Sequence, residues 1–271
     1  PVAEYVYSKA TSAGKRVQAL GGAKNHAVVM PDADLEQTAN AIIGAAYGSA
    51  GERCMAISAV IAVDSVAEPL KEILIPKIEA LKIGPGNDLS NDMGPLITKE
   101  HKKKVMDYIK NGNSSGADLV IDGREHPITN ENAGFFLGPT LFDNVAADMS
   151  IYLEEIFGPV LVMLRAKNFQ QALDLVNNHR FGNGVAVFTS SGSIAREFTN
   201  KVQIGMVGVN VAIPVPLSFY SFGGWKDSIY GSSNIYGMDG VRFFTKLKTV
   251  TTRWPDLNQS SAVDLSMPTV E

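Results

Sequence analysis

The sequence predicts an α/β fold built on a largely parallel sheet, and three observations lead to this prediction. Short apolar segments of strand length alternate along the chain with longer amphipathic segments that have helical spacing. The apolar run 159–164 is nearly continuous, as expected for a strand buried on both faces. Hydrophobic residues make up 45% of the 271 residues, which is enough for a large core. Strands that alternate with helices form βαβ units, and such units build parallel sheets.

The first hundred residues contain elements that follow from local signals. Asp34 is expected to cap a helix, because its carboxylate can accept hydrogen bonds from the first helical turn, and Gln37 completes a capping box. Pro76 must kink or end the helix that contains it. The expected elements are a helix at 5–18, a strand at 27–30, a helix from 34 to the glycine-rich break at 48–51, a strand at 57–63 and a helix at 66–82.

The alternation continues to about residue 211. Asn168 is expected to cap a helix with Gln171 as its capping-box partner. The expected elements are a helix at 98–111, strands at 119–121, 135–142 and 159–164, a helix that begins after 168, a strand at 185–188, a helix at 193–202 and a strand at 206–211.

The character of the sequence changes after residue 211. Residues 212–240 are rich in Pro, Gly, Ser and Tyr, which indicates a long ordered loop. Residues 243–253 alternate apolar side chains with Thr and Lys, as expected for a late edge strand used in pairing. The segment after Pro255 is a polar tail.

Composition argues against several classes of function. The 24 basic and 28 acidic residues give a net charge of -4, so no nucleic-acid partner is expected, and Lys102-Lys103-Lys104 is interpreted as the solvated face of a helix. No apolar run reaches the roughly 18 residues that span a bilayer, so no membrane association is expected. One cysteine excludes a disulfide framework, and the four histidines lack metal-ligand spacing, so no metal site is predicted.

Cys54 is the first candidate for chemistry. A lone free cysteine is most often a small buried hydrophobic residue. Cys54, however, ends the segment Gly51-Glu52-Arg53-Cys54, just after a helix and at a glycine-rich break where backbone can approach a ligand closely. The adjacent guanidinium of Arg53 favours a reactive thiol. These four residues alone leave both interpretations open.

The second candidate is the segment Glu154-Glu155-Ile156-Phe157-Gly158-Pro159. It places two carboxylates and an aromatic ring at the end of the buried strand 159–164, and α/β proteins bind ligands at the ends of strands. The alternative is that both acids are solvated residues in the first turn of a helix capped near Ser150. No G-x-G-x-x-G fingerprint, P-loop or G-x-S-x-G elbow occurs in the chain.

Taken together, these segments resemble the aldehyde dehydrogenase superfamily over residues 14–254. A narrower resemblance, carried by 22–26, 53–55 and 209–216, is to its CoA-acylating methylmalonate-semialdehyde dehydrogenase branch. The wider match rests on the segments 20–26, 32–34, 51–54, 154–159, 177–178, 182–184, 188–189 and 208–210, in the family order.

The resemblance implies a three-layer, parallel-sheet catalytic domain of the aldehyde dehydrogenase fold. It also implies a remnant of the nucleotide-binding domain before it and a C-terminal oligomerisation strand after it. The implied boundaries are 1–22 for the last part of the NAD-binding domain, 23–222 for the catalytic domain, 223–255 for a return segment with the oligomerisation strand, and 256–271 for the tail.

The same resemblance assigns roles to five residues. Cys54 is the nucleophile that attacks the aldehyde, and the cofactor is NAD. Arg53 binds the carboxylate of a malonate or methylmalonate semialdehyde. Glu155 holds the nicotinamide ribose hydroxyls, Phe157 lies beside the nicotinamide, and Gly21 belongs to the cofactor site. Coenzyme A is the co-substrate that releases propionyl-CoA or acetyl-CoA, with loss of carbon dioxide.

Two alternatives remain beside this interpretation. One is a hydrolytic NAD(P)-dependent aldehyde dehydrogenase, whose general base would be a glutamate just before the glycine pair. Leu20, or Ala19 in the other register, occupies that place and cannot accept a proton. The other is a non-catalytic fragment or structural subunit, in which Cys54 would be inert.

Assembly and context follow from the resemblance as well. We expect a homo-oligomer, a dimer or a tetramer, in the cytoplasm or the mitochondrial matrix. The chain begins at Pro1, and the family's nucleotide-binding strands lie upstream of this point. We therefore expect the 271-residue chain to be inactive on its own.

Overall fold

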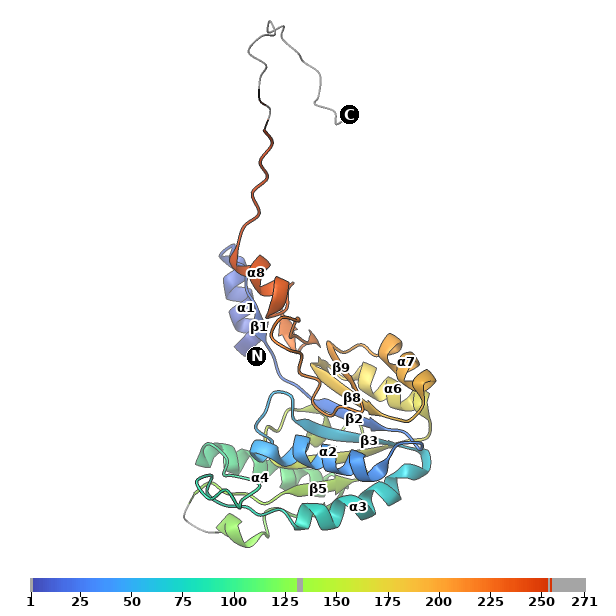
Figure 1. Ribbon diagram of the computed structural model, residues 1–271. Helices are drawn as coiled ribbons and strands as arrows, with labels where there is room; N and C mark the ends of the chain where they lie inside the picture. The colour runs from blue at the N-terminus through green and yellow to red at the C-terminus, as the bar shows by residue number, and fades with distance from the viewer. Residues whose placement is uncertain (1, 131–133, 253, 255–271) are drawn as a thin grey trace, which may run out of the picture.

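The main body of the protein is a seven-stranded sheet with the strand order β4-β5-β6-β3-β2-β8-β9. The computed structural model describes residues 2–130, 134–252 and 254 (Figure 1). All neighbouring strands of the sheet are parallel except β4 and β5. The strands are β2 (Asn25–Val29), β3 (Ile57–Val63), β4 (Asp118–Ile121), β5 (Thr140–Asp143), β6 (Val160–Ala166), β8 (Gly184–Phe188) and β9 (Met206–Val209). This architecture confirms the α/β prediction.

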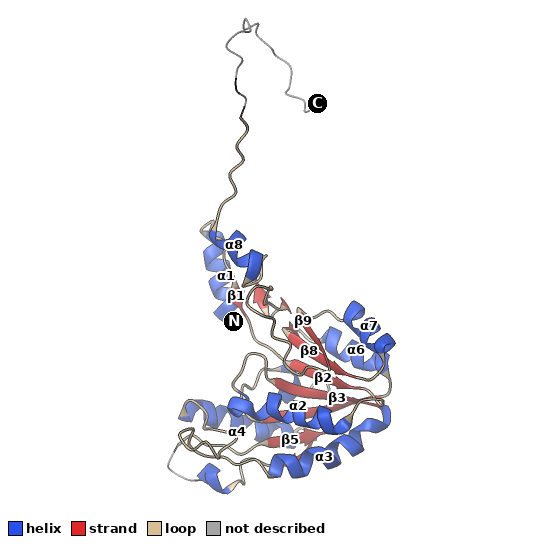
Figure 2. Cartoon of the chain, in the orientation of Figure 1, coloured by secondary structure: helices blue, strands red, loops and turns tan. Residues whose placement is uncertain are grey.

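Helices cover both faces of the sheet and complete three layers (Figure 2). The chain moves from β2 to β3 in one direction along the sheet and on to the edge strand β4. It then returns through β5 and β6 in the other direction and crosses to β8 and β9 at the opposite edge. Because such crossovers are right-handed, α2 and α3 lie on one face and α6 and α7 on the opposite face. The helices are α2 (Leu35–Tyr47), α3 (Ala67–Glu79), α4 (Lys99–Ser114), α5 (Ser150–Leu153), α6 (Phe169–Asn178) and α7 (Gly192–Lys201).

The central strands are apolar because they are covered on both sides. Six of the seven residues in β3, and likewise in β6, are buried. The helix starts follow from the predicted caps: Asp34 accepts from the N–H of Gln37 and Asn168 from the N–H of Gln171, each at 3.0 Å. Pro76 lies inside α3 without ending it.

A smaller substructure joins the two ends of the described chain. Helix α1 (Val2–Ser12) leads into β1 (Ala19–Leu20), which pairs with β11 (Ile229–Tyr230). Strand β7 (Phe181–Gly182) pairs with β10 (Trp225–Lys226) and ties this substructure to the main sheet. Figure 1 shows α1 beside α8 (Gly237–Phe244) at one end of the molecule.

Four predicted elements differ from the structure. The helix expected at 5–18 spans Val2–Ser12 and ends before Gly14, which has a φ of 65°. The strand expected at 135–142 is confined to Thr140–Asp143, because β5 pairs with its neighbours only there. The loop expected at 212–240 contains β10, β11 and the start of α8. The strand expected at 243–253 is not formed within the single chain: Phe243 and Phe244 end α8, and residues 245–252 form no strand, because no sheet edge of the described chain lies beside them. Arg253 and the tail at 256–271 lie outside the described residues.

Candidate active site

The candidate site lies where four parallel strands begin. Cys54 precedes β3, Glu155 precedes β6, Asn25 is the first residue of β2, and Asn183 directly precedes β8. Ligands in open α/β sheets commonly bind beyond the carboxyl ends of the strands. Here the predicted residues gather beyond the amino ends, so the site departs from the rule that motivated the prediction for Glu154 and Glu155.

Cys54 lies in a tightly turned loop between the end of α2 and the start of β3. Helix α2 ends in the 3-10 turn Gly48–Gly51, and Gly51 has a φ of 71°. A Cβ on Gly51 would stand 2.2 Å from the carbonyl oxygen of Gly158, so only glycine allows the two loops to touch. Cys54 is exposed, whereas the next residue, Met55, is buried and anchors the loop.

Two buried amides hold this loop from below, and sequence reasoning assigned no role to either. The Nδ2 groups of Asn25 and Asn183 donate to the carbonyl oxygen of Cys54 at 3.0 Å and 2.9 Å. The signal available in the sequence was indirect: both residues stand in the segments 20–26 and 182–184 that carry the family resemblance.

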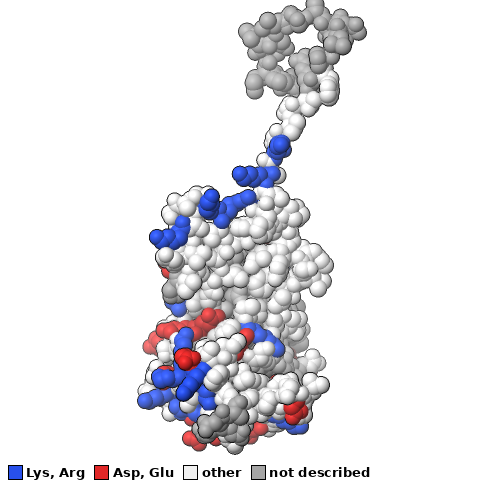
Figure 3. All heavy atoms as spheres, turned by 90° about the vertical axis from the view of Figure 1, so that its left-hand side faces the viewer, with Lys and Arg blue, Asp and Glu red and all other residues white. Residues whose placement is uncertain are grey.

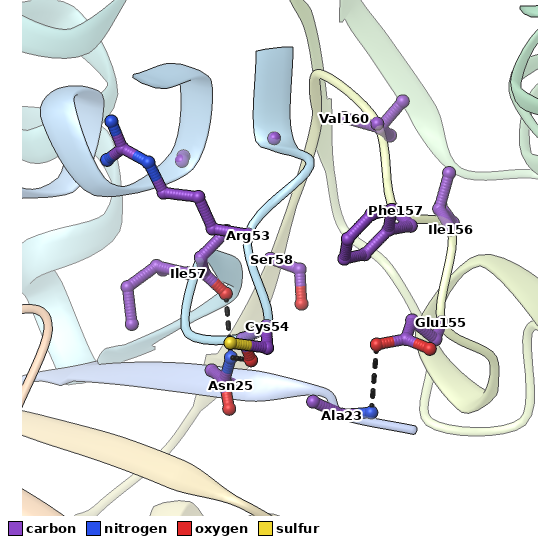
Figure 4. Close-up of a pocket in the computed structure, with 14 residues that line it drawn as sticks. Ala23, Asn25, Arg53, Cys54, Ile57, Ser58, Glu155, Ile156, Phe157 and Val160 are labelled. Carbon is purple, nitrogen blue, oxygen red and sulfur yellow. Dashed lines mark hydrogen bonds between the residues drawn. The ribbon is translucent and has the colours of Figure 1, made fainter. Parts of the chain in front are cut away.

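Glu155 faces the same cavity from the neighbouring loop (Figure 4). Its Oε1 accepts from the N–H of Ala23 at 3.0 Å, and its Oε2 has no hydrogen-bond partner among the described residues. Partial burial raises the pKa of the Glu155 carboxyl, while the Ala23 N–H and the charges of Lys24 and Lys104 act in the opposite direction. One oxygen is therefore free to accept hydrogen bonds from a ligand.

Lys24 is a buried cation that sequence reasoning did not select. Its side chain is 1% exposed, and its Nζ donates to the carbonyl oxygens of Ile151 and Glu154, both at 2.8 Å. These bonds tie the end of α5 to β2 and so fix the start of the segment that carries Glu155. Burial lowers the pKa of Lys24 to about 7, against the raising effect of Glu155 and Glu154.

Phe157 presents its ring toward the cavity, opposite Cys54 (Figure 4). The residue is 37% exposed and has a φ of 59°, in the left-handed region. Its carbonyl oxygen accepts from Nε2 of His101 at 2.6 Å, which holds the loop against α4. An exposed ring fixed in this way can stack on a flat ligand.

Arg53 lines the cavity, but its guanidinium points away from Cys54, toward the end of α2 (Figure 4). There it donates to Oγ of Ser49 at 3.2 Å and to the carbonyl oxygen of Gly44 at 3.4 Å. Both bonds are long and the side chain is exposed, so they hold the guanidinium weakly.

Four of the five predicted residues line one small cavity of about 20 Å³, namely Cys54, Arg53, Glu155 and Phe157. The fifth, Gly21, lines an adjacent hollow of about 530 Å³ that shares Glu155. A Cβ on Gly21 would stand 1.9 Å from the carbonyl oxygen of Asp227, so a larger residue at position 21 would collide with the backbone of Asp227.

The adjacent hollow is charged. It is lined by acidic Glu4, Glu154, Glu155 and Asp227 and by basic Lys104 and Arg180. Figure 3 shows acidic side chains gathered across the middle of this face, with basic ones nearby. Lys104 thus faces the candidate site and is not only part of a solvated helix face. Leu20, 47% exposed, also lines the hollow.

The chain matches known proteins along nearly its whole length. The model of the aldehyde dehydrogenase family matches residues 1–250. A malonate-semialdehyde dehydrogenase of Pseudomonas aeruginosa is 52% identical over 271 residues, which are 100% of this chain and 54% of the relative. The chain therefore spans about half the length of the curated relatives it matches.

Solved structures agree with this similarity. A Sinorhizobium meliloti protein described as a methylmalonate-semialdehyde dehydrogenase, solved in complex with NAD, is 52% identical with a TM-score of 0.92. The match covers 94% of this chain and 52% of that one. The methylmalonate-semialdehyde dehydrogenase of Oceanimonas doudoroffii is 50% identical with a TM-score of 0.92, over 94% of this chain and 53% of that one. Within the described part of the chain, no helix is both long and apolar enough to cross a membrane.

Proposed function

The chain belongs to the aldehyde dehydrogenase family, and from this premise we propose that it is the catalytic part of a CoA-acylating semialdehyde dehydrogenase. The observation that carries the proposal is one cavity that combines an exposed thiol with a carboxylate and an aromatic ring. Cys54 lies on one side of it, and Glu155 and Phe157 lie on the other. The domain boundaries given above are part of this proposal.

In the proposed reaction, the thiolate of Cys54 attacks the carbonyl carbon of the aldehyde and forms a C–S bond. The product is a thiohemiacetal on Cys54. When bound, NAD supplies the acceptor for the hydride that leaves this carbon, and a thioester to Cys54 remains. The thiol of coenzyme A then displaces Cys54, which regains its thiolate. The carboxylate beside the acyl group is lost as carbon dioxide, and a proton replaces it.

The residues present fit a nicotinamide nucleotide. The free Oε2 of Glu155 can accept from the hydroxyls of a ribose, and the exposed ring of Phe157 can lie against a flat base. Gly21 and Leu20 border the same approach. The NAD complex of the Sinorhizobium meliloti relative supports this choice of cofactor.

The substrate class we propose is a short aldehyde with a carboxylate, such as malonate or methylmalonate semialdehyde. Arg53 is the residue that would bind the carboxylate, by leaving its weak contacts with Ser49 and Gly44 for a charge-assisted pair. The names of the two structural relatives and of the Pseudomonas aeruginosa relative support this class.

Leu20 and Ala19 support the proposal that a thiol, and not water, releases the acyl group from Cys54. Neither side chain can activate water, and Leu20 is an apolar residue exposed toward the hollow. The hydrolytic alternative needs a base at this place. The non-catalytic alternative is disfavoured because Cys54 is exposed beside the cavity and not packed in the core.

We further propose that the protein acts as a homo-oligomer, a dimer or tetramer, with no nucleic-acid or membrane partner. The cytoplasm is the compartment we propose, because the relatives reported above come from bacteria.

The test joins this chain to the amino-terminal half of the Pseudomonas aeruginosa relative. With malonate semialdehyde, NAD and coenzyme A, we expect the chimera to form NADH and acetyl-CoA, and Cys54→Ser to lower the rate about 1,000-fold or more. Free acid formed at the same rate without coenzyme A would favour the hydrolytic enzyme. Unchanged activity of Cys54→Ser would reject the proposal. The 271-residue chain alone, expected to be inactive, serves as the control.

A further inference from the structure

Two asparagine side chains converge on the backbone of Cys54 from inside the protein. Asn25 is 2% exposed and Asn183 is 7% exposed. The Nδ2 group of Asn25 donates to the carbonyl oxygen of Cys54 at 3.0 Å, and that of Asn183 donates to the same oxygen at 2.9 Å. Both lone pairs of one carbonyl are therefore used by amides from two different strands, β2 and the start of β8.

The two amides are themselves fixed by further contacts. The Oδ1 of Asn25 accepts from the N–H of Gly184 at 3.0 Å, and its Nδ2 also donates to the carbonyl oxygen of Ala56 at 2.9 Å. The Nδ2 of Asn183 lies 3.0 Å from Sδ of Met55. Because each amide has only one orientation that makes these bonds, both direct their N–H groups, the positive ends of their dipoles, toward Cys54.

The two bonds to the carbonyl oxygen of Cys54 also fix the backbone from which its thiol extends. The peptide unit from Cys54 to Met55 is planar, so an immobile carbonyl leaves little freedom for rotation about the adjacent backbone bond. Figure 4 shows Asn25 bonded below the loop while Glu155 and Phe157 lie across from Cys54.

We propose that Asn25 and Asn183 are positioning residues for Cys54: they hold the nucleophile in place by its own carbonyl oxygen. The inference rests on the proposed function, because only a reacting thiol benefits from such control. A purely structural role is the competing explanation, since the same bonds join β2, the Cys54 loop and β8.

The rate of Cys54 alkylation in folded variants separates these roles. We would measure the rate of reaction with iodoacetamide at a fixed pH in the 271-residue chain and in its Asn183→Ala and Asn183→Ser variants. Removing one donor lets the Cys54 carbonyl leave its place, and is expected to slow alkylation by about threefold.

Asn177 provides matched controls. Its amide also makes two bonds, to the carbonyl oxygen of Lys201 at 3.1 Å and from the N–H of Gln203 at 2.8 Å, but at the end of α6. Asn177→Ala and Asn177→Ser are expected to lower stability without changing the alkylation rate.

An unchanged alkylation rate in folded Asn183 variants, judged by circular dichroism, would overturn the positioning role and leave a structural one. If Asn183→Ala does not fold, Asn183→Ser carries the same test, because it keeps a small polar side chain at this position. The readout does not depend on aldehyde oxidation. A chimera in which Cys54→Ser is active would instead reject the proposed function, so the two failures are distinguishable.

Discussion

At the scale of single residues, the most unusual group in the site is the buried ammonium of Lys24. Burying a charge is costly unless hydrogen bonds compensate for lost water. Lys24 donates two such bonds, to the carbonyl oxygens of Ile151 and Glu154, and its pKa is nevertheless lowered to about 7. The burial of Lys24 therefore lowers the free energy of unfolding at neutral pH, while its two hydrogen bonds anchor the segment that carries Glu155.

This cost predicts a pH-dependent stability. The unfolded chain has an ordinary lysine pKa of 10.5, so between about pH 7 and 10.5 the unfolded state binds more protons than the folded state. The free energy of unfolding should therefore rise with pH in this window. Relative to Lys24→Met, which cannot titrate, the unaltered protein should gain about 2–3 kcal/mol between about pH 7.5 and 9.5, measured by urea denaturation.

The exposed Lys103 is the control for this experiment. Its side chain is 78% exposed and pairs only with Asp107 on the same helix. Lys103→Met should follow the same pH dependence as the unaltered protein. A Lys24→Met variant that does so as well would show that burial does not lower the pKa of Lys24 in the folded protein.

At the scale of elements, the site depends on two loops that touch through glycine backbones. The Cys54 loop and the loop 155–158 meet where Gly51 lies against the carbonyl oxygen of Gly158. The strands behind these loops were predictable, since β3 and β6 are continuous apolar runs with clear helix caps around them. The contact between the loops was not predictable, because it depends on the positive φ of Gly51 and on a close approach of two backbones. Neither feature produces a periodic pattern in the sequence.

Gly51→Ala tests this contact. The new Cβ would stand 2.2 Å from the carbonyl oxygen of Gly158 on a backbone with a φ of 71°, so the loops must separate. We expect a loss of about 2–4 kcal/mol in unfolding free energy and slower alkylation of Cys54.

Gly44→Ala is the matched control for that variant. Gly44 lies on the exposed face of α2, and the position that a Cβ would take there has no neighbouring atom within 4 Å. Alanine at this position should therefore stabilise the helix by about 1 kcal/mol. A Gly51→Ala variant as stable as the unaltered protein would contradict the close approach of the two loops.

At the scale of the whole molecule, the sequence allowed the layers, the strand alternation and four residues of one cavity to be predicted. It did not reveal Lys24, Asn25 or Asn183, because buried polar residues within apolar surroundings carry no periodic signal. It also indicated a strand at 243–253 that the single chain does not form over residues 245–252, because a strand exists only where a partner edge is present. Residues 245–252 have the composition of a strand without that edge.

This mismatch supports the prediction that residues 245–252 pair with a second copy of the chain. Leu247 is 101% exposed and Val250 is 72% exposed, and the segment leads away from the body of the molecule (Figure 1). Within the described residues, β9 pairs only with β8, so one edge of the main sheet is open. An added strand would bury the apolar side chains and satisfy the backbone groups of both partners.

Truncation before Thr245 is therefore expected to lower the oligomeric state, measured by size-exclusion chromatography with light scattering. Truncation before Asp256 keeps the segment and should leave the assembly unchanged. Leu247→Asp combined with Val250→Asp preserves the chain length while placing charges where apolar contacts are needed, so it should dissociate the oligomer as well. An oligomer that survives both the truncation before Thr245 and the double substitution would show that the chains assemble through another surface, and that residues 245–252 have no part in assembly.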